Sequence, residues 1–550
     1  MLHRRSRLLA CLVVLFAVTL LAQGFNAQDV SAAAKKSVRV SAKLSKATVI
    51  AGDRANIRGY VTGTPKRGLL QLQRFSSAKW RTIAKGRTTS RSGAYSFTFR
   101  PAAGSYGYRV TRPTTARTKS GKSATRRLDA ERCTPLSRPA TTSATQVWFN
   151  DTNRNATSHI AKKLGALFCA AAPRSTVNIA MYFLRSDRAE TEKILTPLEI
   201  MHRNRGVKVN VLLENRNSMI TPWTRKRLAK FATLRTCVSG CRNESGTAAI
   251  LHQKFVTISN MSWKTSTDPA VVSSSANWSR EQLRTYWQNA VLVHDDAALA
   301  REFNLRFDSM RVCGTSLCKS WRAPGGRALV DRAGVWGDLA ATPRTGSTGR
   351  GTAAVFSPLP AGVDPVADTF ADLSCTPEHR TVRMAMYYMS PGRAWAAAKQ
   401  LAAMRDRGTA RCDIQVLTSV GGRLTALDQA LAHFATFDIP IRCVNQMHTK
   451  FTVIDANRTV GGAVHQTVLD GSANLAKATL SANDDAQLNL TVQDARGSYA
   501  AGLLGVHKAY RSQWSKMYAR PTSCKQAVAT PKGATSTDLE KRALERLPVE

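Results

Sequence analysis

A seven-residue segment occurs twice in the chain, and this repeat constrains the fold more than any other feature. Thr176–Tyr182 and Thr381–Tyr387 share the pattern Thr-Val-x-x-Ala-Met-Tyr at an offset of 205 residues. The pattern around the first copy is typical of a βαβ unit, with a strand expected over 176–184, a helix over 189–204 and a second strand over 207–214. The repetition of such a unit predicts a duplicated α/β domain.

Each copy also carries a histidine followed two residues later by a lysine. His252 and Lys254 stand before an apolar run in the first copy, and His448 and Lys450 do so in the second. Residues two apart on a strand point to the same side, so each imidazole should lie beside its ammonium group. A single pair of this kind is more often structural than catalytic, but its repetition in a duplicated unit favours a function.

A short polar segment follows each histidine-lysine pair. It contains Ser275 and Asn277 in the first copy and Ser472 and Asn474 in the second, at histidine-to-serine separations of 23 and 24 residues. Displacement at phosphorus needs a nucleophile, an acid for the leaving oxygen, and cations or hydrogen-bond donors for the non-bridging oxygens. Histidine can serve as nucleophile or acid near neutral pH. Two copies could therefore place two histidines on opposite sides of one phosphate, and we expect no cofactor and no metal.

These motifs resemble those of the phospholipase D superfamily, which combine His-x-Lys-x4-Asp with a downstream Gly-Ser-x-Asn. The resemblance covers about residues 140–520, and the second copy is complete because it also contains Asp455 and Gly471. It implies two α/β halves with pseudo-twofold symmetry and a phosphohistidine intermediate. The expected fold class is therefore α/β, a duplicated phospholipase D-like domain preceded by a small all-β sandwich.

Members of this family commonly carry a further acidic residue that hydrogen-bonds the catalytic imidazole. Thirteen residues beyond Ser472 this residue would be Asp485, whereas the same count from Ser275 gives Gln288. A carboxylate on Nδ1 fixes the histidine tautomer and raises the basicity of Nε2. The two halves should therefore differ in how well they support their histidines.

The first copy departs from the motif in two more places, where Ser259 replaces the aspartate and Ser274 replaces the glycine. We therefore expect Asp455 and Asp485 to support His448 as the nucleophile, with His252 as the acid and base. The remaining expected site residues are the two lysines and a substrate-binding set consisting of Ser472, Asn474, Ser275, Asn277 and Gln288.

Residues 34–111 alternate between apolar and polar types and are interrupted by turns such as Ala51–Asp53. Six or seven short strands at this spacing predict a small β-sandwich that resembles immunoglobulin-like modules. Residues 112–132 are rich in Thr, Ser, Lys and Arg and are expected to be a solvated linker. The remaining expected boundaries are 133–335 for the first half, 336–352 for a linker, 353–521 for the second half and 522–550 for a polar tail.

The first 33 residues have the pattern of a secretory signal peptide. Three arginines precede the 14-residue apolar run Leu8–Leu21, and small residues follow at 31–33. The run is shorter than the roughly 20 residues that span a bilayer. We therefore expect a secreted protein, and we expect it to be a monomer.

The chain has 80 Lys and Arg against 36 Asp and Glu, a net charge of +44. Removal of residues 1–33 would leave +42, because three arginines and one aspartate are lost. Such a field attracts phosphate polymers, an anionic membrane surface or an anionic cell wall. Alternatively, the positive charge only keeps a secreted protein soluble.

Ten of the eleven cysteines lie after residue 33, and an even number outside the cell predicts disulfides. The expected pairs are the closest in sequence, namely Cys237 with Cys241, Cys313 with Cys318, and Cys412 with Cys443. The sequence does not pair the other four, which are Cys133, Cys169, Cys375 and Cys524. A zinc site at Cys237 and Cys241 is the competing interpretation.

Taken with secretion, two motifs in one chain favour a phospholipase D-like phosphodiesterase that acts on phospholipid. The positive charge favours the alternative of a secreted, metal-independent nuclease with nucleic acid as substrate. A non-catalytic protein that only binds phosphate is the third hypothesis.

Overall fold

The computed structural model describes residues 34–313 and 350–524, apart from short gaps at 64–67, 89–92, 140–143, 153–157, 186–188, 216–219, 238–239, 242–248, 265, 360–361, 421–423, 496–497 and 523. The expected signal peptide and nearly all of the expected 336–352 linker and polar tail lie outside these residues. The chain divides into two compact units, residues 1–130 and 131–550. None of the helices in the described ranges is long and apolar enough to cross a membrane.

The first unit is a β-sandwich whose two sheets enclose a core that includes Ile57, Leu70, Phe97 and Val110. One sheet has the order β1-β4-β2, with β7 paired to β4, and the other has the order β3-β10-β8-β5-β6, with β9 paired to β8. The strands are β1 (Arg39–Val40), β2 (Lys43–Leu44), β3 (Thr48–Ile50), β4 (Ala55–Thr62), β5 (Leu69–Ser76), β6 (Lys79–Arg87), β7 (Ala94–Phe99), β8 (Gly104–Arg112), β9 (Gly121–Lys122) and β10 (Arg126–Glu131).

The expected linker over 112–132 is wrong, because β9 and β10 lie within it. Arg126 to Ala130 pair with Tyr108 to Gly104 of β8, and Leu128 is fully buried in the core. The basic composition of this segment obscured its strand pattern. Arg126 and Arg127 are exposed, but Leu128 and Ala130 are buried in the alternation typical of a strand.

The second unit begins with a seven-stranded sheet of order β11-β17-β16-β15-β12-β13-β14. Its strands are β11 (Thr145–Asn150), β12 (Thr176–Met181), β13 (Lys208–Glu214), β14 (Thr233–Cys237), β15 (Lys254–Ile258), β16 (Ala270–Ser274) and β17 (Gln288–His294). Its helices are α1 (His159–Cys169), α2 (Ala189–Arg205), α3 (Pro222–Leu228), α4 (Arg280–Arg284) and α5 (Ala297–Cys313). The predicted βαβ unit is confirmed, because β12 and β13 are parallel and α2 connects them.

An eight-stranded sheet follows with the same topology, in the order β18-β25-β24-β23-β20-β21-β22, with β19 paired to β23. Its strands are β18 (Arg350–Phe356), β19 (Leu373–Ser374), β20 (Thr381–Met386), β21 (Asp413–Ser419), β22 (Ile441–Val444), β23 (Lys450–Arg458), β24 (Val464–Gly471) and β25 (Ala486–Ala495). Its helices are α7 (Pro365–Ala371), α8 (Pro391–Arg405), α9 (Leu424–Thr436), α10 (Lys477–Ser481) and α11 (Ser498–Tyr518). The identical strand order confirms the predicted duplicated α/β fold.

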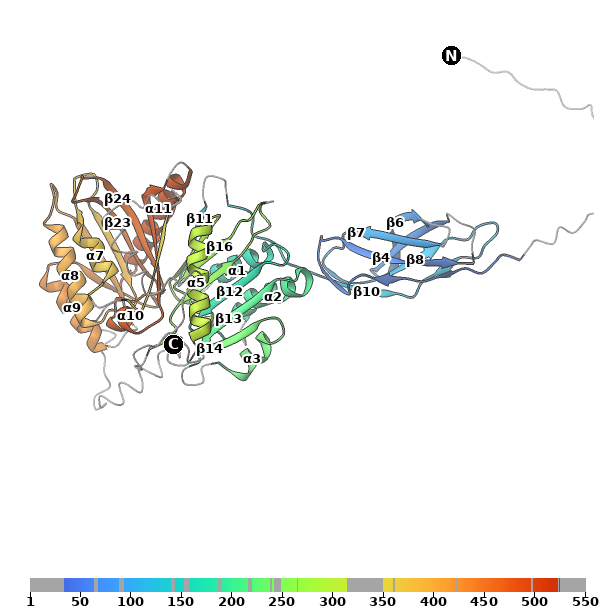
Figure 1. The fold of residues 1–550 in the computed structure, drawn as a ribbon, viewed down its shortest axis with the longest axis horizontal. Coiled ribbons are helices and arrows are strands. Elements are labelled where there is room, and N and C mark those ends of the chain that lie inside the picture. Colours follow the sequence, from blue (N-terminus) through green and yellow to red (C-terminus); the bar gives the residue numbers. More distant parts are fainter. Residues whose placement is uncertain are drawn as a thin grey trace, which may run out of the picture. The chain divides into compact units, whose positions relative to one another are not determined.

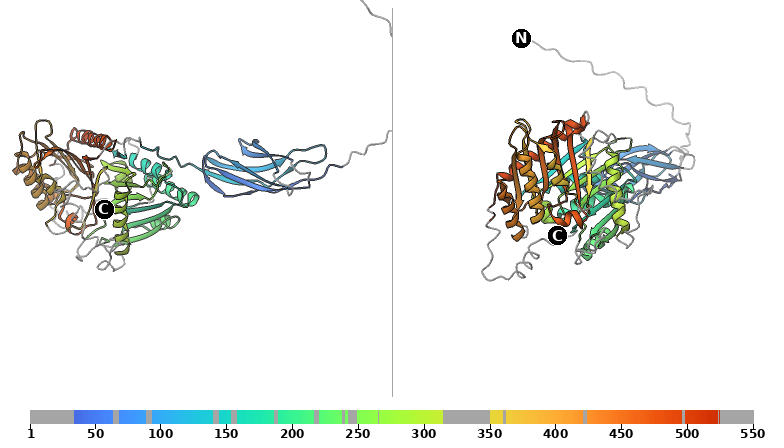
Figure 2. Two further views of the ribbon diagram at one scale, coloured as in Figure 1. Left: turned by 45° about the horizontal axis from the view of Figure 1, so that its top comes forward. Right: turned by 60° about the vertical axis from the view of Figure 1, so that its left-hand side comes forward.

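The two halves share one hydrophobic core. It joins side chains of both sheets, such as Phe255 and Phe451, with Phe303 of α5 and Tyr510 of α11. Figure 1 shows α5 on the side of the first half that faces the second, while α8 and α9 lie on the far side of the second sheet. The views in Figure 2 show the same arrangement of the two halves within this unit. Because the core is shared, residues of one half can reach the site of the other.

Four disulfides lie in the described residues: Cys133–Cys169, Cys237–Cys241, Cys375–Cys412 and Cys443–Cys524. The pair Cys237–Cys241 is as predicted, and it replaces the zinc hypothesis. The predicted pairing of Cys412 with Cys443 is wrong. Cys443 lies opposite Thr418 on the neighbouring strand, and Cys412 stands six residues earlier, about 20 Å along the strand direction. A disulfide cannot span that separation. Cys318 lies outside the described residues.

Candidate active site

Both histidine-lysine pairs stand at the beginning of the corresponding central strands. Lys254 opens β15 and Lys450 opens β23, and each histidine lies two residues earlier. All four side chains are buried, with at most 4% of any of these residues exposed. The Nζ atom of each lysine donates to the backbone carbonyl of its own histidine, at 2.8 Å in the first half and 2.7 Å in the second. The Lys450 Nζ also lies 3.1 Å from Nδ1 of His448. His252 and Lys254 both lie against the Tyr182 ring, so the predicted same-face arrangement is present in both copies.

The backbones of the two halves contact each other beside these histidines. Leu251 forms a bridge with Asp484, and the His252 amide donates to the Asp484 carbonyl at 2.8 Å. In the equivalent place Trp287 forms a bridge with Met447, and the His448 amide donates to the Trp287 carbonyl at 3.1 Å. Each histidine therefore lies next to the strand β25 or β17 of the opposite half.

This crossing reverses the expected support of the two histidines. The Asp485 carboxylate lies 2.7 Å from Nδ1 of His252, in the other half, and the same Oδ1 accepts the Ser472 hydroxyl at 2.7 Å. Asp485 and His252 are both fully or almost fully buried. Burial, and then the charge of Lys254, holds the pKa of His252 below its usual value, although Asp485 opposes this shift. Burial alone would raise the pKa of Asp485, but its pKa is lowered because His252, Lys254 and Ser472 favour the carboxylate.

His448 instead faces neutral acceptors from the first half. Its Nδ1 lies 3.1 Å from the Ser275 carbonyl oxygen and 3.4 Å from Oε1 of Gln288. The Lys450 Nζ lies 3.1 Å from the same nitrogen. The expectation that Asp485 supports His448 and Gln288 faces His252 is therefore wrong, and the two partners are exchanged.

Asp455 does not support His448 either. Its Oδ1 lies 2.7 Å from Nδ1 of His379 and accepts from Gln466 at 3.3 Å, and its Oδ2 lies 3.6 Å from Arg511. Asp455 stands five residues after Lys450 on β23, so its side chain leaves the opposite face of the strand. The motif aspartate thus anchors the far end of the strand.

The two motif serines are held within the protein rather than left open to a ligand. The Ser472 hydroxyl donates to Asp485, and the Ser275 hydroxyl donates to Oε1 of Gln288 at 2.6 Å. Gln288 is itself held by Gln282. Ser472 thus holds the partner of His252, and Ser275 holds Gln288, the partner of His448. These roles differ from the substrate-binding role expected for the three residues.

The replacement of the motif glycine by Ser274 is accommodated locally. Gly471 has a φ of 145°, and a Cβ there would lie 2.2 Å from the Ala486 carbonyl oxygen. Ser274 does not have a positive φ, and its hydroxyl donates to the Asn289 carbonyl at 2.9 Å. The two halves therefore differ in backbone conformation at this point but share the same strand pairing.

Two tyrosines belong to the site and were not predicted. The Tyr182 ring lies 5.4 Å from the His252 ring, and the Tyr387 ring lies 4.5 Å from the His448 ring. Lys254 and Lys450 lie over these rings at 5.3 and 4.9 Å. The sequence could have indicated them, because the repeated seven-residue segment ends on these tyrosines. The strand formed by each segment pairs with the strand that follows the histidine.

Comparison with known proteins agrees with this geometry. The model of a domain described as "Cardiolipin synthase, PLD-like domain" matches residues 169–311 and 377–501, which is once in each half. The chain belongs to the phospholipase D superfamily. No curated protein matches the chain at a significant level.

Solved structures similar to this phospholipase D superfamily chain include the yeast tyrosyl-DNA phosphodiesterase, at 10% identity and a TM-score of 0.38, covering 64% of this chain and 91% of that one. Polyphosphate kinase from Porphyromonas gingivalis is similar at 9% identity and a TM-score of 0.40, covering 88% of this chain and 79% of that one. Both scores are low, and the family assignment depends on the matched domain model and the motifs.

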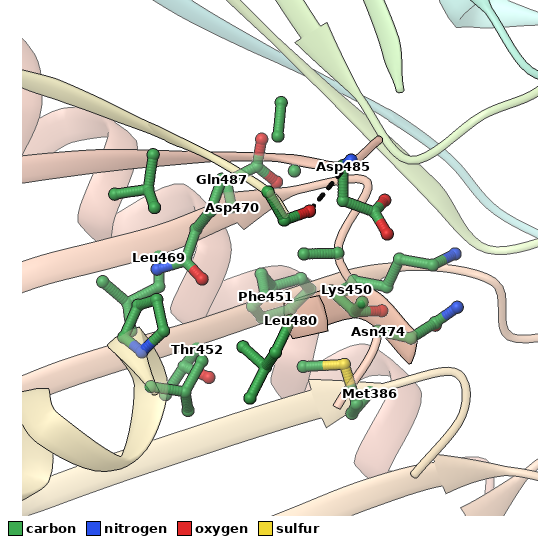
Figure 3. Close-up of a pocket in the computed structure, with 18 of the residues that line it drawn as sticks. Met386, Lys450, Phe451, Thr452, Leu469, Asp470, Asn474, Leu480, Asp485 and Gln487 are labelled. Carbon is green, nitrogen blue, oxygen red and sulfur yellow. Dashed lines mark hydrogen bonds between the residues drawn. The ribbon is translucent and has the colours of Figure 1, made fainter. Parts of the chain in front are cut away.

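A small pocket lies beside the second motif of this phospholipase D-like site. Figure 3 shows Lys450, Asn474 and Asp485 projecting toward the same side, with Leu469 and Leu480 in its apolar part. Its volume of about 30 Å³ leaves room for about two water molecules. Within the described residues four buried oxygens that line it have no hydrogen-bond partner, and these are Oδ2 of Asp470, Oδ1 of Asn474, Oγ1 of Thr479 and Oδ2 of Asp485.

A disulfide-closed turn braces the contact that carries His252 and Asp485. The Cys241 amide donates to Oδ2 of Asp484 at 2.7 Å, and the amides of Gly240 and Leu251 donate to Oε2 of Glu214 at 3.0 and 2.8 Å. The Arg306 guanidinium holds the other oxygen of Asp484 at 2.8 Å. The Cys237–Cys241 disulfide thus fixes the segment on which the register of the two halves depends.

Proposed function

We propose that the protein is a secreted phospholipase D-like phosphodiesterase that hydrolyses phospholipid through a phosphohistidine on His252. The observation that carries this proposal is the buried contact of Asp485 with Nδ1 of His252. It keeps the proton on Nδ1 and leaves Nε2 with a free electron pair. The lowered pKa of His252 also favours the neutral imidazole that a nucleophile requires.

In the first step Nε2 of His252 attacks phosphorus, and the bond to the leaving oxygen breaks. His448 gives its Nε2 proton to that oxygen. In the second step His448 takes a proton from water, whose oxygen attacks phosphorus, and the phosphorus–nitrogen bond breaks. Lys254 and Lys450, with Asn277 and Asn474, would hold the non-bridging oxygens.

One observation favours phospholipid, and a second weakens the charge argument for nucleic acid. The matched domain model is of the cardiolipin synthase type. In addition, half of the +42 charge of residues 34–550 lies in the N-terminal β-sandwich. The net charge of the chain is therefore no direct evidence for a basic track at the catalytic site. The pocket beside Lys450 is too small for an acyl chain, so the lipid tails would lie outside it.

The test is hydrolysis of phosphatidylcholine vesicles and of single-stranded DNA by the mature protein in parallel, with EDTA present. We expect release of choline and phosphatidic acid, and loss of this activity in His252→Ala and His448→Ala. Cleavage of DNA with no cleavage of lipid would replace this proposal with the nuclease. Binding of both substrates without cleavage would identify a phosphate-binding protein.

A further inference from the structure

The N-terminal β-sandwich has an extreme charge balance. Residues 34–130 contain 23 lysines and arginines, only two aspartates and no glutamate. One of these aspartates, Asp129, lies 3.4 Å from Arg127 and accepts the Ser105 hydroxyl. A domain of 97 residues with a net charge of +21 repels itself, and nothing in the proposed catalysis uses this charge.

The cations extend over the outer face of the β10-β8-β5-β6 sheet. Lys85 is paired with Gln71 and Arg87 with Leu69, while the alternating residues Leu70 and Leu72 are buried. The pairing places Lys85 and Arg87 on the outer side, where both are exposed.

The opposite face of the sandwich carries exposed cations as well. Lys43 of β2 is paired with Arg58 of β4, and both are exposed, whereas the neighbouring Ile57 is fully buried. Arg39 of β1, paired with Thr62, is exposed at the next strand. Cations on both outer faces fit a flexible polyanion that surrounds the domain, because a planar bilayer can meet only one face.

The exposed aromatic rings of the sandwich do not form one track for nucleobases. The Arg109 guanidinium lies over the Trp80 ring at 4.0 Å, and the centroid of the Phe75 ring lies 5.3 Å from that of the Trp80 ring. Arg109 is fixed in this place because its Nε donates to Oε1 of Gln73 at 2.9 Å. Single-stranded nucleic acid binding usually relies on open aromatic rings that stack successive bases. Trp80 is already covered by Arg109, and the two exposed rings, Phe75 of β5 and Tyr60 of β4, belong to different sheets of the sandwich.

We propose that this domain binds a linear polyphosphodiester of polyol or sugar units, the chemistry of an anionic cell-wall polymer. Phosphates would contact Lys85 and Arg87 on one face and Lys43 and Arg58 on the other. The function goes beyond phosphodiester cleavage, since it retains the enzyme at a surface without taking part in the reaction.

The test measures binding of the full mature chain to poly(glycerol phosphate) over a range of salt concentrations. Two variants remove one pair of cations each, Lys85→Gln with Arg87→Gln and Lys43→Gln with Arg58→Gln. A control with the same change in net charge alters two exposed cations of α3, Arg225→Gln with Lys226→Gln. Each sandwich variant should reduce the slope of log affinity against log salt by about 2, since one phosphate contact contributes about 1. The control should keep the wild-type slope.

Comparison polymers separate the other partners. Tighter binding to a poly(dT) oligonucleotide than to poly(glycerol phosphate) would overturn the proposal in favour of nucleic acid. Tighter binding to phosphatidylglycerol vesicles, with an effect of only one of the two pairs, would overturn it in favour of a membrane. All variants should cleave a soluble p-nitrophenyl phosphodiester at the wild-type rate, so failure of the catalytic proposal and failure of this one are distinguishable.

Discussion

Replacement of Asp485 by asparagine tests the support of His252 most sharply. Asparagine has the same shape and can still accept the Ser472 hydroxyl, so the change removes the charge and little else. The Nδ1–Oδ1 distance is 2.7 Å and Asp485 is 1% exposed, so solvent screens this contact little. A buried hydrogen bond to a charged group contributes about 1.5–3 kcal/mol, which corresponds to a loss of about 10- to 150-fold in rate.

The assay is the pre-steady-state release of p-nitrophenol from a p-nitrophenyl phosphodiester, which reports formation of the phosphoenzyme. Asp485→Asn should slow this step by the factor given above. Because Asp485 raises the pKa of His252, its loss should also move the acidic limb of the pH–rate profile to lower pH.

Gln288→Ala is the matched control, because it occupies the equivalent position beside His448. A p-nitrophenolate leaving group needs no proton from His448, so this variant should release p-nitrophenol within about threefold of the wild-type rate. The reasoning is refuted if Asp485→Asn reacts like the wild type, or if Gln288→Ala is the more impaired variant in the first step.

Three further predictions concern the surroundings of the site. Burial raises the pKa of Asp470 to about 7, so the wild type should lose up to about 4 kcal/mol of folding stability as the pH rises from about 4 to 7. Asp470→Asn should lose less stability over this range, and an equal pH dependence of the two proteins in denaturant unfolding would contradict the prediction. The described residues contain no cluster of His, Cys, Asp and Glu that could hold a metal, and we predict full activity in EDTA, whereas activity restored only by added Mg²⁺ or Ca²⁺ would disprove a histidine-based site. Removal of the Cys237–Cys241 disulfide should lower kcat by up to about 100-fold in protein that stays folded by circular dichroism. Removal of Cys133–Cys169 should leave kcat unchanged, and equal effects would mean that both disulfides only stabilise the fold.

The sequence predicted the elements of the site but not their partners. The repeat ending at Tyr182 and Tyr387 predicted a duplicated α/β unit, because local periodicity determines strands and helices. It also predicted that His448 and Lys450 share one face. The partner of each histidine depends on contacts between residues at least 160 positions apart, and counting along one copy cannot reveal that Asp485 crosses to His252.

The same limit explains the errors in the disulfide pairing and in the expected linker. Cys412 and Cys443 are near in sequence, but parallel neighbouring strands place them at different heights, and each finds a more distant partner. The segment over 112–132 has the composition of a linker, and only its pairing with β8 makes Leu128 part of a core. In each case the deciding contact is tertiary, and a single sequence does not display it.

The most direct test of the central claim is to locate the phosphate on the trapped intermediate. The wild-type protein would be mixed with a p-nitrophenyl phosphodiester, denatured rapidly at alkaline pH, where phosphohistidine is stable, and mapped by mass spectrometry. We predict label on His252, label retained in His448→Ala, and none in His252→Ala. Label on His448, or an unlabelled protein that still turns over substrate, would contradict the assignment of His252 as the nucleophile.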